Sequence, residues 1–275
     1  MPGRASRHRP SASPPPRLTV MTSPAGPDLD HTSFGVPDAL AVARRLRAEL
    51  GAVPVFGETL REFRYVTLYA GTTEAGANIE LLEPTGPGFL SRFLDARGAG
   101  PHHITFTVPD LAASVAQVRE LGLTVVGESY EHAPWREAFI APDRVHATVI
   151  QLAQTDRPHP PLAELLTTRE RRPEDFPIGA GATDLDWWTP VWDTAPEGQG
   201  RLGATYLGST DPDLSHRLFA GVLGATPTPE ADGVRFTWPG GSLLVDETVT
   251  PGVRGMELVG GPTGGIPIGP ALLGR

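Results

Sequence analysis

The chain has 275 residues, of which 39% are apolar and 20% charged, and its formal net charge is −9. This acidic balance argues against a nucleic-acid-binding surface, and no apolar run approaches the roughly 18 residues that a membrane span needs. The chain has no cysteine, and its basic residues are all arginine. Disulfides, thiolate chemistry, Schiff-base lysines and phosphate-binding P-loops are therefore excluded, and we expect a soluble, cytoplasmic protein.

The first 28 residues differ in composition from the rest. They contain seven prolines and several Ser and Arg residues, and Asp28 is the first acidic residue of the chain. No apolar stretch resembles the core of a secretory signal. We expect residues 1–28 to form a disordered tail, with Met21 as an alternative start.

Residues 29–84 are predicted to form a βαβββ unit. A short strand through Val36 leads to a helix near Asp38, whose carboxylate suits the free N–H groups at a helix start. The helix has apolar residues at helical spacing, and Gly51 is placed to end it: these are Leu40, Ala43, Leu46 and Leu50. Three strands are predicted around residues 54–56, 64–69 and 77–82.

A second unit, residues 102–154, repeats the first. A connecting segment with a short helix at 90–96 precedes it. The strand at 104–108, the helix at 111–121 and strands near 124–128, 136–140 and 147–152 follow the same order. Five positions match in register, namely His31/His103, Phe34/Phe106, Val36/Val108, Pro37/Pro109 and Asp38/Asp110. A repeat near 70 residues is too long for a solenoid and indicates a duplicated module.

Residues 155–201 break this pattern and are predicted to be a Pro- and Arg-rich linker with one helix near 162–170. Its end, residues 187–192, holds three of the five tryptophans. This segment could be a lid, a binding surface or a packed edge, and packing is favoured because tryptophan usually buries its ring.

A third, degenerate module is predicted at residues 202–260. Its first strand spans 204–211, its helix 214–222, and its later strands 234–238, 242–245 and 255–259. Ala204 stands where the first two modules have histidine, and Glu257 therefore lacks a histidine partner and is read as structural. The Gly- and Pro-rich residues 261–275 are predicted to be a tail. An uncovered half-module is unfavourable, so residues 187–192 or a second subunit should cover it. We favour a combination, in which the tryptophans pack locally and the module contributes to a homodimer.

Polar residues interrupt the apolar first and last strands of the first two modules. They are His31 and Glu80 in the first module, and His103 and Gln151 in the second. Such interruptions are costly unless a partner satisfies them. Two modules related by a pseudo-two-fold axis would bring the four side chains together. Imidazole, carboxylate and amide groups suit a divalent first-row metal, and a site without thiolates keeps room for water or substrate.

The chain resembles the vicinal oxygen chelate superfamily, which includes glyoxalase I, methylmalonyl-CoA epimerase, extradiol dioxygenases and bleomycin-resistance proteins. The resemblance rests on the pair Asp30-His31 and on segments 79–84, 102–104, 135–140 and 149–152. It implies an α+β fold in which two βαβββ modules pair into a cup, here followed by a third degenerate module. It also implies that His31, Glu80, His103 and Gln151 bind Mn, Fe, Co, Ni or Zn.

The chain departs from the epimerase pattern in one respect. In that pattern the carboxylate ligand lies on the last strand of the second module and the amide on that of the first, whereas here Glu80 and Gln151 are exchanged. A second catalytic carboxylate is not evident, because neither Glu58 nor Glu62 falls on the family position.

Three functions fit these residues, each with a small-molecule substrate. The favoured one is a metal-dependent isomerase or lyase for a carbonyl or acyl-thioester substrate, with Glu80 as metal ligand and general base. An iron(II) ring-cleaving dioxygenase and a metal-free antibiotic-binding protein are the alternatives. Trp135 and Arg136 are candidates for substrate contact, although Arg136 fits a surface ion pair equally well. His102 and His146 are expected on the strand faces opposite to the site, where His102 would support the site or be exposed and His146 would be solvated.

Overall fold

The computed structural model describes residues 26–132, 135–156, 166 and 185–274. The predicted helix at 162–170 lies outside the described residues except for Leu166, and so do the first 25 residues of the predicted tail. Asp28 already belongs to the first strand. Within the described part of the chain, no helix is both long and apolar enough to cross a membrane.

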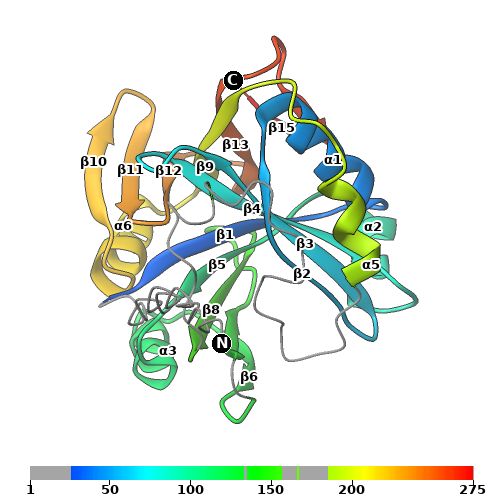
Figure 1. Ribbon diagram of the computed structural model, residues 1–275. Helices are drawn as coiled ribbons and strands as arrows, with labels where there is room; N and C mark the ends of the chain where they lie inside the picture. The colour runs from blue at the N-terminus through cyan, green and yellow to red at the C-terminus, as the bar shows by residue number, and fades with distance from the viewer. Residues whose placement is uncertain (1–25, 133–134, 157–165, 167–184, 275) are drawn as a thin grey trace, which may run out of the picture.

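The first sheet contains the two predicted modules. It has eight strands in the order β2-β3-β4-β1-β5-β8-β7-β6, and Figure 1 shows β1 and β5 side by side at its centre. Its strands are β1 (Asp28–Gly35), β2 (Val53–Thr59), β3 (Phe63–Gly71), β4 (Gly76–Pro84), β5 (Gly100–Thr107), β6 (Val125–Ser129), β7 (Trp135–Ile140) and β8 (Val149–Thr155). The central pair is antiparallel, while β4 is parallel to β1 and β8 to β5. The two halves of the sheet therefore repeat one arrangement.

Three helices belong to this sheet, namely α1 (Ala39–Leu50), α2 (Phe89–Arg97) and α3 (Leu111–Glu120). Asp38 and Asp110 accept hydrogen bonds from backbone N–H groups in the first turns of α1 and α3, which is the N-cap interaction that the sequence predicts. Gly51 ends α1 in the left-handed conformation, which glycine adopts without a steric penalty. Helices α1 and α3 bury their apolar sides against one face of the sheet. We call the opposite face of each sheet its inner face.

The third module lies in a second sheet, whose strand order is β10-β11-β12-β9-β13-β15-β14. Its strands are β9 (Gly200–Ser209), β10 (Thr226–Glu230), β11 (Gly233–Trp238), β12 (Gly241–Glu247), β13 (Gly252–Gly260), β14 (Ile266–Ile268) and β15 (Ala271–Leu273). Its helical segment consists of α6 (Pro212–His216) and the π-helical η3 (Arg217–Val222). The parallel partner of β9 is β12, as β4 is the parallel partner of β1.

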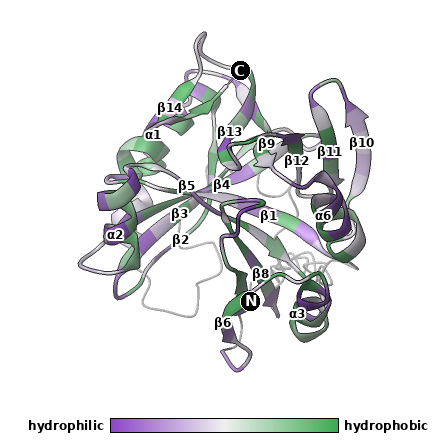
Figure 2. Cartoon of the chain, turned by 180° about the vertical axis from the view of Figure 1, so that it is seen from behind, coloured by the Kyte–Doolittle hydropathy of each residue, from purple (hydrophilic) through white to green (hydrophobic). Residues whose placement is uncertain are grey.

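Two expectations for this region are wrong. The segment around Glu257 is not the last strand of the third module, because β13 lies on the other side of β9, where β5 lies in the first sheet. The last strand of the module is β12, and the strand that the sequence analysis lacks is β10, which corresponds to β2 of the first sheet. Strand β10 has the sequence TPTPE and is coloured hydrophilic in Figure 2. Residues 261–275 are also not a plain tail, since β14 and β15 form a hairpin that buries Ile266, Ile268 and Leu273.

The two sheets pack through their helix-bearing faces. A shared apolar cluster joins Ile104 and Phe106 of β5 to Leu207 of β9, Leu243 of β12 and Phe219 of η3. Phe219 is fully buried, and its ring centroid lies 6.1 Å from that of Phe106 and 5.5 Å from that of Phe236. The first sheet therefore covers the helix-bearing face of the third module, and the homodimer stays a prediction.

The tryptophan segment is packed, as predicted, but in a different place. It forms α5 (Leu185–Trp188) and the 3₁₀ turn η2 (Thr189–Val191), which contact β2 and α1 of the first module; Figure 1 shows α5 beside α1. The three indole rings are buried, with the guanidinium of Arg64 over Trp187 and that of Arg47 over Trp192. The segment therefore covers the first module and not the third.

Candidate metal site

Four predicted side chains meet on the inner face of the first sheet. His31 comes from β1, Glu80 from β4, His103 from β5 and Gln151 from β8, and each is less than a tenth exposed. One ligand atom from each of His31, Glu80 and His103 lies within 4.8 Å of the other two. The amide oxygen of Gln151 lies 3.1 Å from Nε2 of His103. The central pairing of β1 with β5 thus brings the two modules' polar residues into one cluster.

Glu80 is held at the centre of this cluster. Its Oε2 accepts a 2.6 Å hydrogen bond from the Ser33 hydroxyl and lies 3.4 Å from Nε2 of His31. Burial disfavours a charge here, but the attraction of His31 and His103 and the Ser33 hydrogen bond outweigh it and lower the pKa of Glu80 to about 2. The carboxylate is therefore ionised, which is the form that binds a cation.

The two histidines differ in protonation. Burial opposes a charge on His31, but Glu80 and Asp30 outweigh this and raise the pKa of His31 to about 10. Burial dominates at His103 and lowers its pKa to about 3 despite the attraction of Glu80. His103 is thus neutral, which is the form that binds a metal.

The cluster fits a metal ion by its donor atoms. Nε2 of His31 is buried and lies 3.4 Å from Oε2 of Glu80, while Nδ1 of the same ring is held by Asp30 at 2.5 Å. A metal ion bound here would displace one proton of this ring. Nδ1 of His103 lies 2.8 Å from Nδ1 of His102. Both rings therefore have a partner on the nitrogen that faces away from Glu80, the arrangement by which proteins orient metal-binding histidines.

The surrounding residues are partly those expected. His102 packs against Phe89 and Phe93 and touches His103, so it supports the cluster. His146 was predicted on a solvated strand face but is buried, with Nε2 3.0 Å from the Ser215 hydroxyl. The reason is that the second sheet covers this side of the first.

The two candidate substrate residues are separated. Trp135 and Arg136 are consecutive in β7 and therefore point to opposite faces. Arg136 forms a bidentate ion pair with Asp156, at 3.0 and 2.7 Å, away from the cluster. Trp135 instead donates a 3.2 Å hydrogen bond from Nε1 to Glu137, which in turn accepts one from the Gln151 amide. The structure brings only Trp135 toward the cluster.

Two further carboxylates lie on the inner face. Glu137 was missed, although its position two residues before Phe139, which pairs with Gln151, places it on the same side. Burial raises its pKa above the usual value. Glu58 in β2 is buried and accepts a 3.1 Å hydrogen bond from the Tyr65 hydroxyl, and burial raises the pKa of Tyr65 well above its usual value. Glu62 is exposed.

Known proteins share this part of the chain. Residues 25–139 match the model of the glyoxalase/bleomycin resistance protein/dioxygenase superfamily. The ethylmalonyl-CoA/methylmalonyl-CoA epimerase of Cereibacter sphaeroides is 35% identical over 101 residues, which are 36% of this chain and 74% of that protein. The chain belongs to the glyoxalase/bleomycin resistance protein/dioxygenase superfamily.

Solved structures of epimerases are similar to about half of this chain. A variant of Streptomyces coelicolor methylmalonyl-CoA epimerase in complex with 2-nitronate-propionyl-CoA is 24% identical, with a TM-score of 0.43, and covers 49% of this chain and 99% of that one. The methylmalonyl-CoA epimerase of Mycobacterium tuberculosis is 26% identical, with a TM-score of 0.42, over 49% of this chain and 93% of that one. The superfamily match includes His31, Glu80 and His103 and ends before Gln151.

Proposed function

We propose that this protein is a divalent-metal-dependent isomerase that moves a proton next to the carbonyl group of an acyl-CoA thioester. The proposal rests on four side chains that converge on one sheet face and are the proposed metal ligands, namely His31, Glu80, His103 and Gln151. The likeness to a relative named as an acyl-CoA epimerase supports the reaction class. A divalent metal held by these residues would polarise a carbonyl oxygen and acidify the neighbouring C–H bond.

The chain's own residues would move the proton. Glu80 is the proposed acceptor, since it is the carboxylate at the centre of the cluster. An isomerase that inverts a carbon also needs a group that returns a proton. Tyr65 is the proposed group that returns the proton, because it lies on the inner face and its hydroxyl donates a hydrogen bond to Glu58. The burial of these side chains would keep water from the reacting carbon.

Metal analysis of protein purified without added metal tests the first half of this proposal. The second half needs a screen of acyl-CoA, 2-oxoacyl and hemithioacetal compounds in D2O, with deuterium uptake at carbon as the readout. We expect uptake into an acyl-CoA substrate that stops on chelation and returns with Mn²⁺, Co²⁺ or Zn²⁺. Turnover of a hemithioacetal alone would indicate a lyase, and tight binding without exchange a binding protein. Oxygen uptake with iron(II) would indicate a dioxygenase, for which the two histidines and Glu80 are a suitable ligand set.

A further inference from the structure

Gln151 differs from the other three residues of the cluster because its two ends are chemically different. The amide oxygen can bind a cation, whereas the amide NH2 can only donate hydrogen bonds. A rotation of the terminal amide group by half a turn would exchange these ends. A carboxylate such as Glu80 has no such problem, since either oxygen can be the ligand. An amide ligand therefore needs neighbours that fix its orientation.

The structure provides a neighbour at each end of the amide. Oε1 of Gln151 accepts a 2.7 Å hydrogen bond from the Thr105 hydroxyl and lies 3.1 Å from Nε2 of His103. Nε2 of Gln151 donates a 2.7 Å hydrogen bond to Oε2 of Glu137. The same carboxylate oxygen accepts from Nε1 of Trp135 at 3.2 Å, and this second hydrogen bond holds Glu137 in place.

We propose that Glu137 is a positioning residue that keeps Oε1 of Gln151 directed toward His31, Glu80 and His103. It does so by accepting the hydrogen bond of the amide NH2. The proposal rests on the proposed metal site, because it concerns the fourth ligand of that site. It also explains why the second module has a carboxylate at the position of Glu137, whereas the first module has none at the corresponding position.

The strand register supports this explanation. Glu137 pairs with Ala153, two residues after Gln151, and Tyr65 pairs with Leu82, two residues after Glu80. Tyr65 is thus the counterpart of Glu137 in the first module. Its hydroxyl donates to Glu58, and Glu80 is held by Ser33 instead. The module with the carboxylate ligand has a tyrosine here, and the module with the amide ligand has the acceptor that an amide needs.

The test is a titration of metal-free protein with Co²⁺ and with Zn²⁺, by calorimetry and by the visible spectrum of bound Co²⁺. Glu137→Leu removes the acceptor, and we expect metal affinity to fall about 10-fold or more. Glu137→Gln keeps an acceptor oxygen and should recover most of this affinity. The matched control is Glu128→Gln, an exposed carboxylate on the neighbouring strand, which should bind metal as the unmodified protein does.

A double variant separates positioning from a general structural effect. If Glu137 acts through Gln151, Glu137→Leu combined with Gln151→Leu should bind metal no more weakly than Gln151→Leu alone. Additive losses, or an unchanged affinity in Glu137→Leu, would overturn the proposal while leaving the metal site intact. If Glu137→Leu fails to fold, Glu137→Gln decides the matter, because a loss of metal affinity greater than that in Gln151→Leu would also refute positioning. If the unmodified protein binds no metal, the proposed function fails and this proposal fails with it.

Discussion

Strand β1 brings His31 to the inner face of the first sheet, and β9 brings Ala204 to the corresponding place in the second. The registers extend this comparison. Thr32 pairs with Ile79 and Thr205 with Leu243, so Leu244 corresponds to Glu80. Ser33 pairs with His103 and Tyr206 with Gly255, so Gly255 corresponds to His103. The second sheet repeats the strand arrangement without the metal-binding side chains.

The polar residues of the second inner face bind each other. Arg235 forms ion pairs with Glu230 and Glu257 and contacts the Ser242 hydroxyl. Glu257 also accepts a hydrogen bond from the backbone N–H of Ala204. In the first sheet, by contrast, the polar side chains include His31, Glu80 and His103, whose ligand atoms lie close enough together to hold a metal ion. The same arrangement of strands therefore has two roles: it forms a candidate site in the first sheet and a supporting layer in the second.

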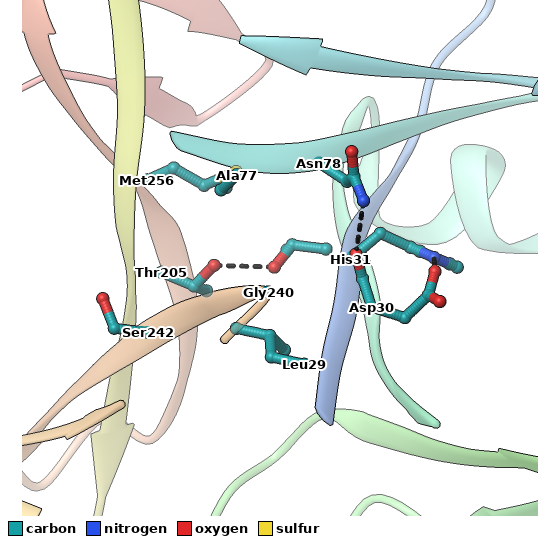
Figure 3. A pocket seen from close by; sticks show the side chains of 10 residues that line it. Leu29, Asp30, His31, Ala77, Asn78, Thr205, Gly240, Ser242 and Met256 are labelled. Carbon is teal, nitrogen blue, oxygen red and sulfur yellow. Dashed lines mark hydrogen bonds and ion pairs between the residues drawn. The ribbon is translucent and has the colours of Figure 1, made fainter. Parts of the chain in front are cut away.

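The supporting layer lies directly behind the strand that bears His31. The Thr32 and Thr205 hydroxyls are 2.6 Å apart across the interface, and the backbone N–H of Gly240 donates to Asp28 at 2.7 Å. Figure 3 shows the small gap here, lined by residues of both sheets that include Leu29, Thr205, Gly240 and Met256. The second sheet thus fixes β1 from the side opposite to the cluster.

The largest effect is expected from making the first inner face resemble the second. His31→Ala gives β1 the side chain that Ala204 gives β9, and His103→Ala removes the other imidazole. Each should reduce metal affinity and turnover by at least about 100-fold, since losing a ligand costs more than losing its supporting partner. Metal content after dialysis and turnover measure this.

The control for these variants is His132→Ala, which removes an exposed histidine on the β6–β7 connection. It should retain metal and turnover. Gln151→Ala should weaken metal binding less than either site histidine variant, because a neutral amide contributes less than an imidazole. Unchanged metal content in both His31→Ala and His103→Ala would disprove the site.

Much of the first sheet could be predicted because its sequence is duplicated. The match of His31 with His103 and of Asp38 with Asp110 gives the strand and the helix start of each module. The second sheet is harder to predict from sequence, since proline is unfavourable in most strands. Pro227 and Pro229 therefore argue against a strand at β10, although an edge strand such as β10 tolerates them. The glycines and prolines around β14 and β15 likewise argue against strands there.

The site was predictable only to the extent that its residues interrupt apolar strands. His31, Glu80, His103 and Gln151 do so and were found. Glu137 lies in a half-buried strand of mixed polarity, where a glutamate is unremarkable until Gln151 is known to contact it. The charge of Arg136 suggests contact with an anionic substrate group, but strand alternation places this side chain on the face opposite to Glu137.

A second prediction concerns whether the two sheets unfold together. Phe219→Ala empties a fully buried site at their junction, and such substitutions cost about 3–5 kcal/mol. We expect one thermal transition, shifted to lower temperature, because the apolar cluster is continuous across both sheets. Calorimetry with near-ultraviolet circular dichroism measures it. Two separate transitions, with metal binding lost only in the second, would mean that the sheets are independent.

A third, smaller effect concerns pH at the same junction. Burial lowers the pKa of His146 below its usual value, despite Asp143 and Asp211 nearby. Above about pH 6.5, the usual histidine value, His146 is neutral in both the folded and the unfolded chain. Below it the unfolded chain takes up a proton first, so stability falls as pH falls, by at most about 1.4 kcal/mol per pH unit.

His146→Gln isolates this contribution, because the cluster residues titrate equally in both proteins. Denaturant unfolding of each protein at about pH 7.5 and about pH 5.5 gives the two losses of stability. The unmodified protein should lose more than the variant over this interval. Equal losses would show that His146 takes up its proton as readily in the folded as in the unfolded protein.

The smallest effect is expected from the second inner face itself. Arg235→Gln breaks the ion pairs with Glu230 and Glu257, which are partly exposed and therefore contribute about 0–1 kcal/mol to the free energy of unfolding. Metal affinity and turnover should stay unchanged, because these pairs lie on the face of the second sheet that points away from β1. A small loss of stability with an intact site would agree with a supporting layer. A loss of metal affinity at unchanged stability would instead mean that the second inner face is coupled to the site through β9 and β1, and the comparison drawn between the two sheets would be wrong.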